Sequence, residues 1–130
     1  MQKLTKPLIF SAFCGDQCKG IKSWITFGKS YFGGGFDIHT GTYTVPEAGY
    51  YIFGLQANSG TGNNNTKINM YLNNRSYTTV AYDGNGMGSY NNLGTSWNAP
   101  LKKGDVIRLK VESGDLDSYL YWWGFRIFKF

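Results

Sequence analysis

The chain has 130 residues, which is enough for one folded domain and too few for two. Aromatic residues supply 18% of the sequence and glycine occupies 18 positions, a composition typical of pleated sheets with tight turns and unfavourable to helical bundles. The net charge of +5 permits an anionic partner, but the basic residues are too scattered to predict nucleic-acid binding, and a solvated surface is their simplest interpretation.

Residues 1–130 are expected to form a single domain, with about residues 1–6 as an N-terminal extension. These first residues lack the apolar core of a signal peptide, so we expect no leader within the chain. Nowhere does an apolar run approach the roughly 18 residues that a membrane-spanning helix requires, which predicts no membrane span.

The first predicted strand, residues 8–13, ends at a pair of cysteines. Cys14 and Cys18 are the only cysteines, and with the single histidine they supply too few ligands for a four-ligand zinc site. Their spacing of three residues also differs from the two of a redox motif. A small disulfide loop and two free thiols remain possible, and Gly15 and Asp16 favour the disulfide because they form a tight turn easily.

The middle of the chain consists of short segments with strand character. Apolar residues occupy every second position in the strongest of them, which is typical of strands with one buried face. Asn73-Asn74 lies between two such segments and predicts a two-residue hairpin turn, because Asn tolerates positive φ angles. The predicted strands are residues 24–27, 43–45, 51–57, 67–72, 76–82, 91–98 and 107–111. With no convincing helical window, they predict an all-β antiparallel sandwich or barrel.

The last segment, residues 119–130, is apolar on both faces of its predicted strand. One face carries Tyr121, Trp123, Phe125 and Ile127, and the other carries Leu120, Trp122, Phe128 and Phe130. An antiparallel strand usually has one wet face, so we expect a neighbouring subunit to cover the second apolar face. The alternative is a central strand that is buried within one subunit. The residues expected in the subunit interface are Tyr121, Trp122, Trp123, Phe125 and Phe128.

Four motifs occur in a fixed order along the chain. They are Phe-Ser-Ala-Phe at residues 10–13, Gly-Tyr-Tyr-Ile-Phe at 49–53, Leu-Lys-Lys-Gly-Asp at 101–105 and Trp-Gly-Phe at 123–125. Together they resemble the globular head domain of complement C1q, within the wider C1q and tumour necrosis factor superfamily. The resemblance implies a ten-stranded jelly-roll sandwich that assembles as a homotrimer, with one sheet of each subunit around the threefold axis.

The resemblance also implies a candidate calcium site. Some family members bind calcium near the trimer axis through an Asp that follows a Tyr and another Asp eight residues later. Asp83 follows Tyr82 here, and Asn91 stands at the second position. Calcium accepts amide as well as carboxylate oxygens, so we expect Asp83 and Asn91 as its ligands, unless Asp83 only caps a turn.

Catalysis is not expected. No Gly-x-Ser-x-Gly motif occurs, and the single histidine, His39, lies in a predicted turn. The glycine-rich segment 84–88 follows a predicted strand, but no helix is predicted after it to bind phosphate.

The resemblance therefore implies a secreted, trimeric recognition module. We expect lectin-like pattern recognition of glycans or anionic microbial surface molecules in innate immunity, with trimeric display raising a weak single-site affinity. Aromatic residues on predicted loops are the candidate ligand contacts, namely Tyr82, Tyr90, Trp97 and Tyr119. The alternatives are a receptor-binding ligand of the adipokine or synaptic-organiser type and a structural trimerisation end-domain.

Overall fold

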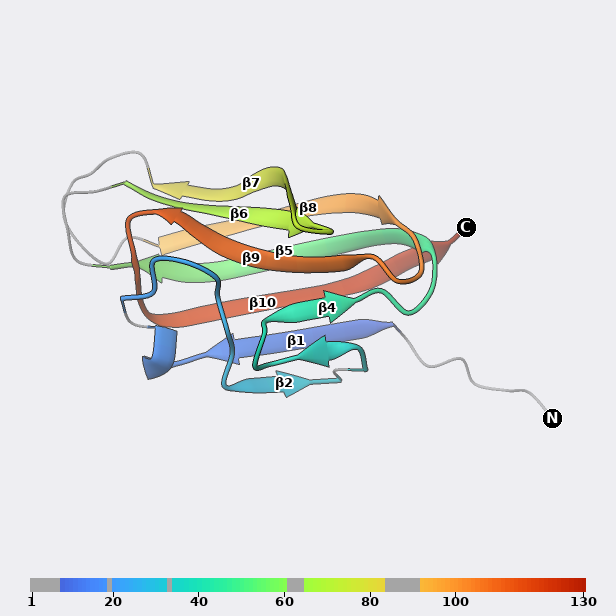
Figure 1. Cartoon of the computed structure of the whole chain (residues 1–130), viewed down its shortest axis with the longest axis horizontal. Coiled ribbons are helices and arrows are strands. Elements are labelled where there is room, and N and C mark those ends of the chain that lie inside the picture. The colour runs from blue at the N-terminus through green and yellow to red at the C-terminus, as the bar shows by residue number, and fades with distance from the viewer. Residues whose placement is uncertain (1–7, 19, 33, 61–64, 84–91) are drawn as a thin grey trace.

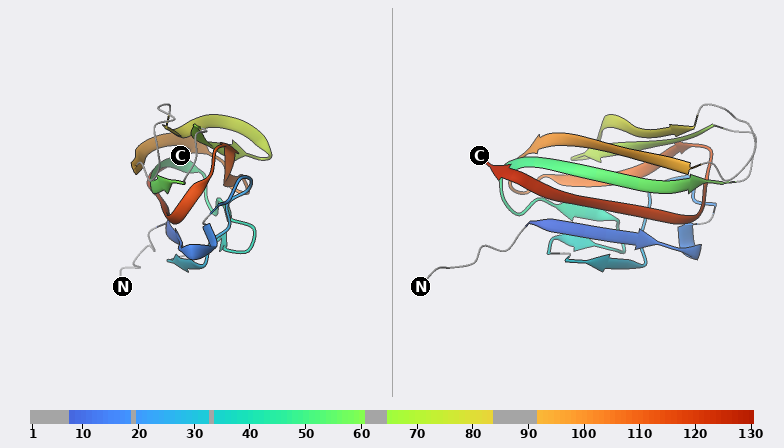
Figure 2. Two further views of the ribbon diagram at one scale, coloured as in Figure 1. Left: turned by 90° about the vertical axis from the view of Figure 1, so that its left-hand side faces the viewer. Right: turned by 180° about the vertical axis from the view of Figure 1, so that it is seen from behind.

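A computed structural model describes residues 8–18, 20–32, 34–60, 65–83 and 92–130. Within these ranges ten antiparallel strands form two five-stranded sheets, which pack face to face as two layers (Figures 1 and 2). The structure thus confirms the predicted all-β, ten-stranded antiparallel sandwich.

The two sheets are named here after their central strands. The β10 sheet consists, in spatial order, of β2 (Lys29–Tyr31), β1 (Ile9–Cys14), β10 (Leu116–Lys129), β5 (Gly49–Ser59) and β8 (Asn92–Leu101). The β9 sheet consists of β3 (Phe36–Asp37), β4 (Thr42–Thr44), β9 (Val106–Ser113), β6 (Thr66–Leu72) and β7 (Arg75–Asp83). Most neighbouring strands are distant in sequence, which is the connectivity of a jelly roll.

The core lies between the sheets and is built by side chains that alternate along each strand. In β10, Leu120 and Trp122 are fully buried, whereas Trp123 points to the other side and is exposed. The Trp122 ring packs edge-on against Phe10 of β1, with 4.9 Å between ring centroids. Trp122 therefore belongs to the core of one subunit, and its predicted place in a subunit interface is wrong.

Residues 24–27 do not form the predicted strand. Trp24 makes a single bridge to Lys110 of β9, and the Ile25 amide donates to the Leu109 carbonyl at 3.0 Å. Three residues later, the Gly28 amide donates to Phe13 of the opposite sheet at 3.1 Å. The segment thus crosses from one sheet to the other, which prevents it from pairing along its length with either.

The cysteine loop closes as predicted. Cys14 and Cys18 form a disulfide across the short 3-10 helix η1 (Asp16–Cys18), with 5.6 Å between their Cα atoms. Both cysteines are fully buried, so the disulfide forms part of the core. Apart from η1, the described residues contain no helical element, and no helix there has the length and hydrophobicity that a membrane span requires.

Candidate functional site

An apolar surface covers the centre of the outward side of the β10 sheet, over β1, β10 and β5. Tyr121, Trp123 and Phe125 of β10 are 37%, 37% and 39% exposed, and Ile127 is 50% exposed. The strand register places further apolar side chains beside them, because directly paired residues point to the same side of a sheet. We call this surface the apolar face; it comprises Ile9, Phe13, Tyr50, Ile52, Tyr121, Trp123, Phe125, Ile127 and Phe128.

Phe128 reaches the apolar face through a change of register. The pairing of β10 with β5 shifts between Arg126 and Phe128, so Phe128 pairs with Tyr50. The two rings stack with 5.5 Å between centroids and 7° between planes. Phe128 therefore lies on the same side as Trp123, not on the side of Trp122 as the simple alternation predicted.

Gly54 shapes the centre of the apolar face. It pairs with Trp123, and a Cβ atom at this position would overlap the indole ring. Trp123 can thus lie directly over the β5 backbone, and its ring stacks on Phe125 at a centroid distance of 6.1 Å. The result is a surface without a projecting side chain at position 54, which suits close contact with another flat surface.

The predicted ligand contacts do not gather in one place. Tyr82 lies in β7 of the β9 sheet and is 57% exposed, whereas Trp97 and Tyr119 lie in β8 and β10 of the other sheet. All three lie in strands, in agreement with the predicted strand ranges 76–82, 91–98 and 119–130 and against their selection as loop residues; Tyr90 lies outside the described residues. Tyr119 is half-buried and packs edge-on against Tyr121, with 5.2 Å between ring centroids.

Trp97 points into the sandwich. Its Nε1 donates to the Met70 Sδ of the opposite sheet at 3.1 Å, and its ring stacks on Phe53 with 5.7 Å between centroids. Both its polar atom and one face of its ring are thus used within the subunit, which makes Trp97 a packing residue.

Asp83, the predicted calcium ligand, ends β7 and is half-buried. One of its carboxylate oxygens lies 3.2 Å from the Ser59 hydroxyl, which donates to it. Asn91 lies outside the described residues, and among those described no three His, Cys, Asp or Glu side chains gather in a possible metal site. Calcium needs six to eight oxygen ligands, so binding at Asp83 stays a prediction.

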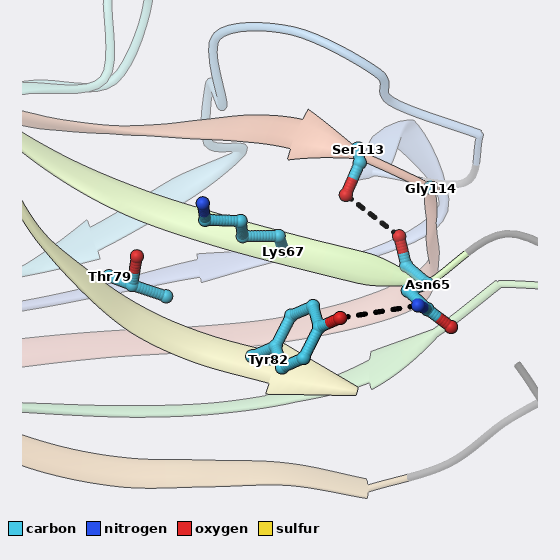
Figure 3. A pocket seen from close by; sticks show the side chains of 6 residues that line it. All are labelled: Asn65, Lys67, Thr79, Tyr82, Ser113 and Gly114. Carbon is cyan, nitrogen blue, oxygen red and sulfur yellow. Dashed lines mark hydrogen bonds between the residues drawn. The ribbon is translucent and has the colours of Figure 1, made fainter. Parts of the chain in front are cut away.

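A pocket of about 810 Å³ lies at one end of the β9 sheet, on the outward side (Figure 3). Three neighbouring strands build it, because Lys67 of β6 pairs with Tyr82 of β7 and with Ser113 of β9. Its lining is mostly polar with one basic residue and consists of Asn65, Lys67, Thr79, Tyr82, Ser113 and Gly114. We call it the Lys67 pocket.

A β-bulge brings Thr79 and Tyr82 to the same side of β7. The β6–β7 register shifts after the pair Ile68–Ala81, so Val80 and Ala81 are both buried between two outward-facing residues. In a regular strand, residues three apart point to opposite sides. The sequence pattern carried no sign of this bulge, and Thr79 was therefore not among the predicted site residues.

Two hydrogen bonds fix the mouth of the Lys67 pocket, as the dashed lines in Figure 3 show. The Ser113 hydroxyl donates to the Asn65 carbonyl at 2.8 Å, and the Asn65 side-chain amide donates to the Tyr82 hydroxyl at 3.2 Å. Lys67 forms no salt bridge or hydrogen bond within the described part of the chain, so its ammonium group is available to a ligand.

Further along the outward side of the β9 sheet, aromatic and basic side chains pair with each other. The Arg108 guanidinium lies 3.9 Å from the centroid of the Trp24 ring, and its Nη2 donates to the Thr40 carbonyl at 2.8 Å. Burial lowers the pKa of Arg108 from its usual value. Tyr71 packs edge-on against Trp24 and donates to Glu112. These contacts are internal, so the cluster is structural.

Comparison with known proteins identifies the family. The family model of the C1q domain matches residues 9–124. The chain belongs to the C1q domain family. No significant match was found among curated proteins.

Solved structures agree with this C1q domain in fold. One similar structure is the globular domain of zebrafish complement 1qA protein, with a TM-score of 0.80 and 20% identity over 96% of this chain and all of the other. Another is the Eiger TNF of S. frugiperda, with a TM-score of 0.70 and 10% identity over 96% of each chain. C1q and TNF-like domains form trimers and act as ligand or recognition modules rather than enzymes, and C1q-domain proteins are generally secreted or extracellular.

Proposed function

We propose that this C1q domain is a secreted, trimeric recognition module that binds glycans or anionic microbial surface molecules in innate immunity. The observation that carries the proposal is the division of the outward surface into two parts. The apolar face on the β10 sheet suits association with further copies, and the polar Lys67 pocket on the β9 sheet suits a soluble or surface-bound ligand.

Association is favoured by the area and chemistry of the apolar face. Burial of apolar surface contributes about 25 cal/mol per Å², and a single aromatic side chain can bury roughly 150–250 Å². Several such rings are 37–54% exposed in one subunit. Their contact with neighbouring subunits would therefore contribute several kcal/mol to a trimer of the kind that the family forms.

Glycan binding is favoured by the residue types that line the Lys67 pocket. Sugars bind proteins through hydrogen bonds to their hydroxyl groups and through contacts of their apolar faces with aromatic rings. The exposed Tyr82 ring and the polar groups of Asn65, Thr79 and Ser113 offer both kinds of contact. Three copies in one trimer would turn a weak single site into a useful overall affinity.

The test is a glycan array probed with protein whose oligomeric state has been verified. We expect binding to a restricted set of glycans, with acidic ones over-represented. A parallel array in excess chelator tests the calcium proposal, because loss of binding would indicate a role for Asp83 and Asn91. No binding above background to any glycan, with and without calcium, would contradict the glycan-binding function.

A further inference from the structure

We infer that the Lys67 pocket is the subsite for a carboxylated sugar, such as a uronic or sialic acid residue of an acidic glycan. The inference rests on the proposed glycan-binding function and assigns its charged contact to particular atoms. It is carried by the arrangement of hydrogen-bond donors and acceptors around Lys67 (Figure 3).

The free donors of the pocket suit a carboxylate. Tyr82 accepts a hydrogen bond from the Asn65 amide, so the proton of its own hydroxyl remains available to a ligand. Lys67 pairs with Tyr82 across β6 and β7, and its ammonium group points along β6 away from the Tyr82 hydroxyl (Figure 3). Rotation of the flexible Lys67 side chain toward Tyr82 would let the ammonium and the hydroxyl each donate to one oxygen of a carboxylate, and such charge-assisted bonds are among the strongest in proteins.

The remaining polar atoms suit the hydroxyl groups of a sugar ring. The Thr79 hydroxyl donates to Asn69 Oδ1 at 2.8 Å, and the Ser113 hydroxyl donates to the Asn65 carbonyl at 2.8 Å. Both hydroxyl protons are thus used inside the protein, and the lone pairs of both oxygens can accept from a ligand. The pocket thus offers two acceptors, the Thr79 and Ser113 oxygens, and two donors, Lys67 and Tyr82. This set matches a molecule with one anionic group and several O–H donors.

Charge and position support the same ligand class. Arg108, Lys110 and Glu112 lie on the outward side of the same sheet, so two cations and one carboxylate give this surface an excess of positive charge. The pocket faces away from the apolar face, because the two belong to opposite layers of the sandwich (Figure 2). Association through the apolar face would thus display one Lys67 pocket per subunit.

Calorimetry with two short acidic oligosaccharides, trigalacturonic acid and disialic acid, tests the inference. Each is compared with its methyl ester, which keeps the sugar hydroxyls and removes the negative charge. We expect the wild-type protein to bind at least one of the acids and to bind its ester about tenfold more weakly or not at all, which is the loss expected for one charge-assisted hydrogen bond.

Two variants assign the effect to the pocket. Lys67→Met should weaken binding of the acid about tenfold or more, and Tyr82→Phe about threefold, while circular dichroism and thermal melting stay close to wild type. Lys103→Met is the matched control, because Lys103 is exposed in the turn at the other end of β9 and the substitution removes the same charge. This control should bind within about twofold of wild type.

Failure of the inference differs from failure of the proposed function. Three results would each overturn the carboxylate subsite while glycan binding stands. They are equal binding of acid and ester, equal losses of affinity in Lys67→Met and Lys103→Met, and array binding restricted to neutral glycans. Absence of binding to both acids and to every glycan of the array would overturn the proposed function itself.

Discussion

The two outward faces of the sandwich are built from the same kind of antiparallel sheet but differ in chemistry. On the β10 sheet, the side chains exposed along β10 between Tyr121 and Phe128 are aromatic or aliphatic, and Trp123 lies over Gly54. On the β9 sheet, register shifts on both sides of β6 surround Lys67 with polar groups and a pocket forms. The inward positions thus specify the fold, while each outward face is free to acquire a separate role.

The largest expected effect comes from a charge on the apolar face. Tyr121→Lys would place an ammonium group where a neighbouring subunit is expected, and burial of an unpaired charge costs several kcal/mol per copy. We expect the trimer to dissociate into folded monomers, as measured by analytical ultracentrifugation. Tyr71→Lys is the matched control on the opposite face, where Glu112 can pair with the new charge, and it should leave the trimer intact. Equal behaviour of the two variants would remove the distinction between the faces.

The two sides of β10 are expected to respond differently to truncation of their tryptophans. Trp122→Ala should lower the free energy of unfolding by about 3–5 kcal/mol, because it leaves a cavity among the core aromatic rings. Trp123→Ala should instead weaken association while the isolated subunit keeps its secondary structure. Urea unfolding and sedimentation at several protein concentrations measure the two effects. A Trp123→Ala protein that unfolds as readily as Trp122→Ala would show that the exposed indole is a core residue.

A smaller effect is expected from a single methyl group. Gly54→Ala places a Cβ atom against the Trp123 indole, and the displaced ring should weaken association by about 1–3 kcal/mol. Gly94→Ala is the control, because Gly94 lies on β8 of the same sheet and a Cβ atom there would meet no atom from elsewhere in the chain within 4 Å. We expect the association constant of this control to match wild type. Equal association of both variants would show that the shape of the apolar face at Gly54 does not matter.

Much of the fold followed from two-residue alternation and turn chemistry. The hairpin turn at Asn73-Asn74 was predicted, and both residues adopt positive φ angles of 51° and 68°. The disulfide between Cys14 and Cys18 was favoured over two free thiols by the turn residues Gly15 and Asp16, and it forms. These features depend on neighbours in sequence, which is why local reasoning could reach them.

The candidate site was less predictable, because it depends on register shifts and long-range pairing. Tyr82 was singled out as an aromatic ligand contact, but Lys67, Thr79 and Ser113 were not. Lys67 pairs with Ser113, which is 46 positions later in the numbering, and a bulge turns Thr79 toward the pocket. A bulge adds one residue without a clear sequence signal, so alternation assigns the residues beyond it to the wrong side, as it did for Phe128.

The central claim is that the apolar face joins copies of this domain and leaves the Lys67 pocket free. Sedimentation equilibrium of the wild-type protein at micromolar concentration tests it most directly. The expected mass is three times that of the 14.6 kDa chain, about 44 kDa. A stable species of 14.6 kDa at that concentration would contradict the account.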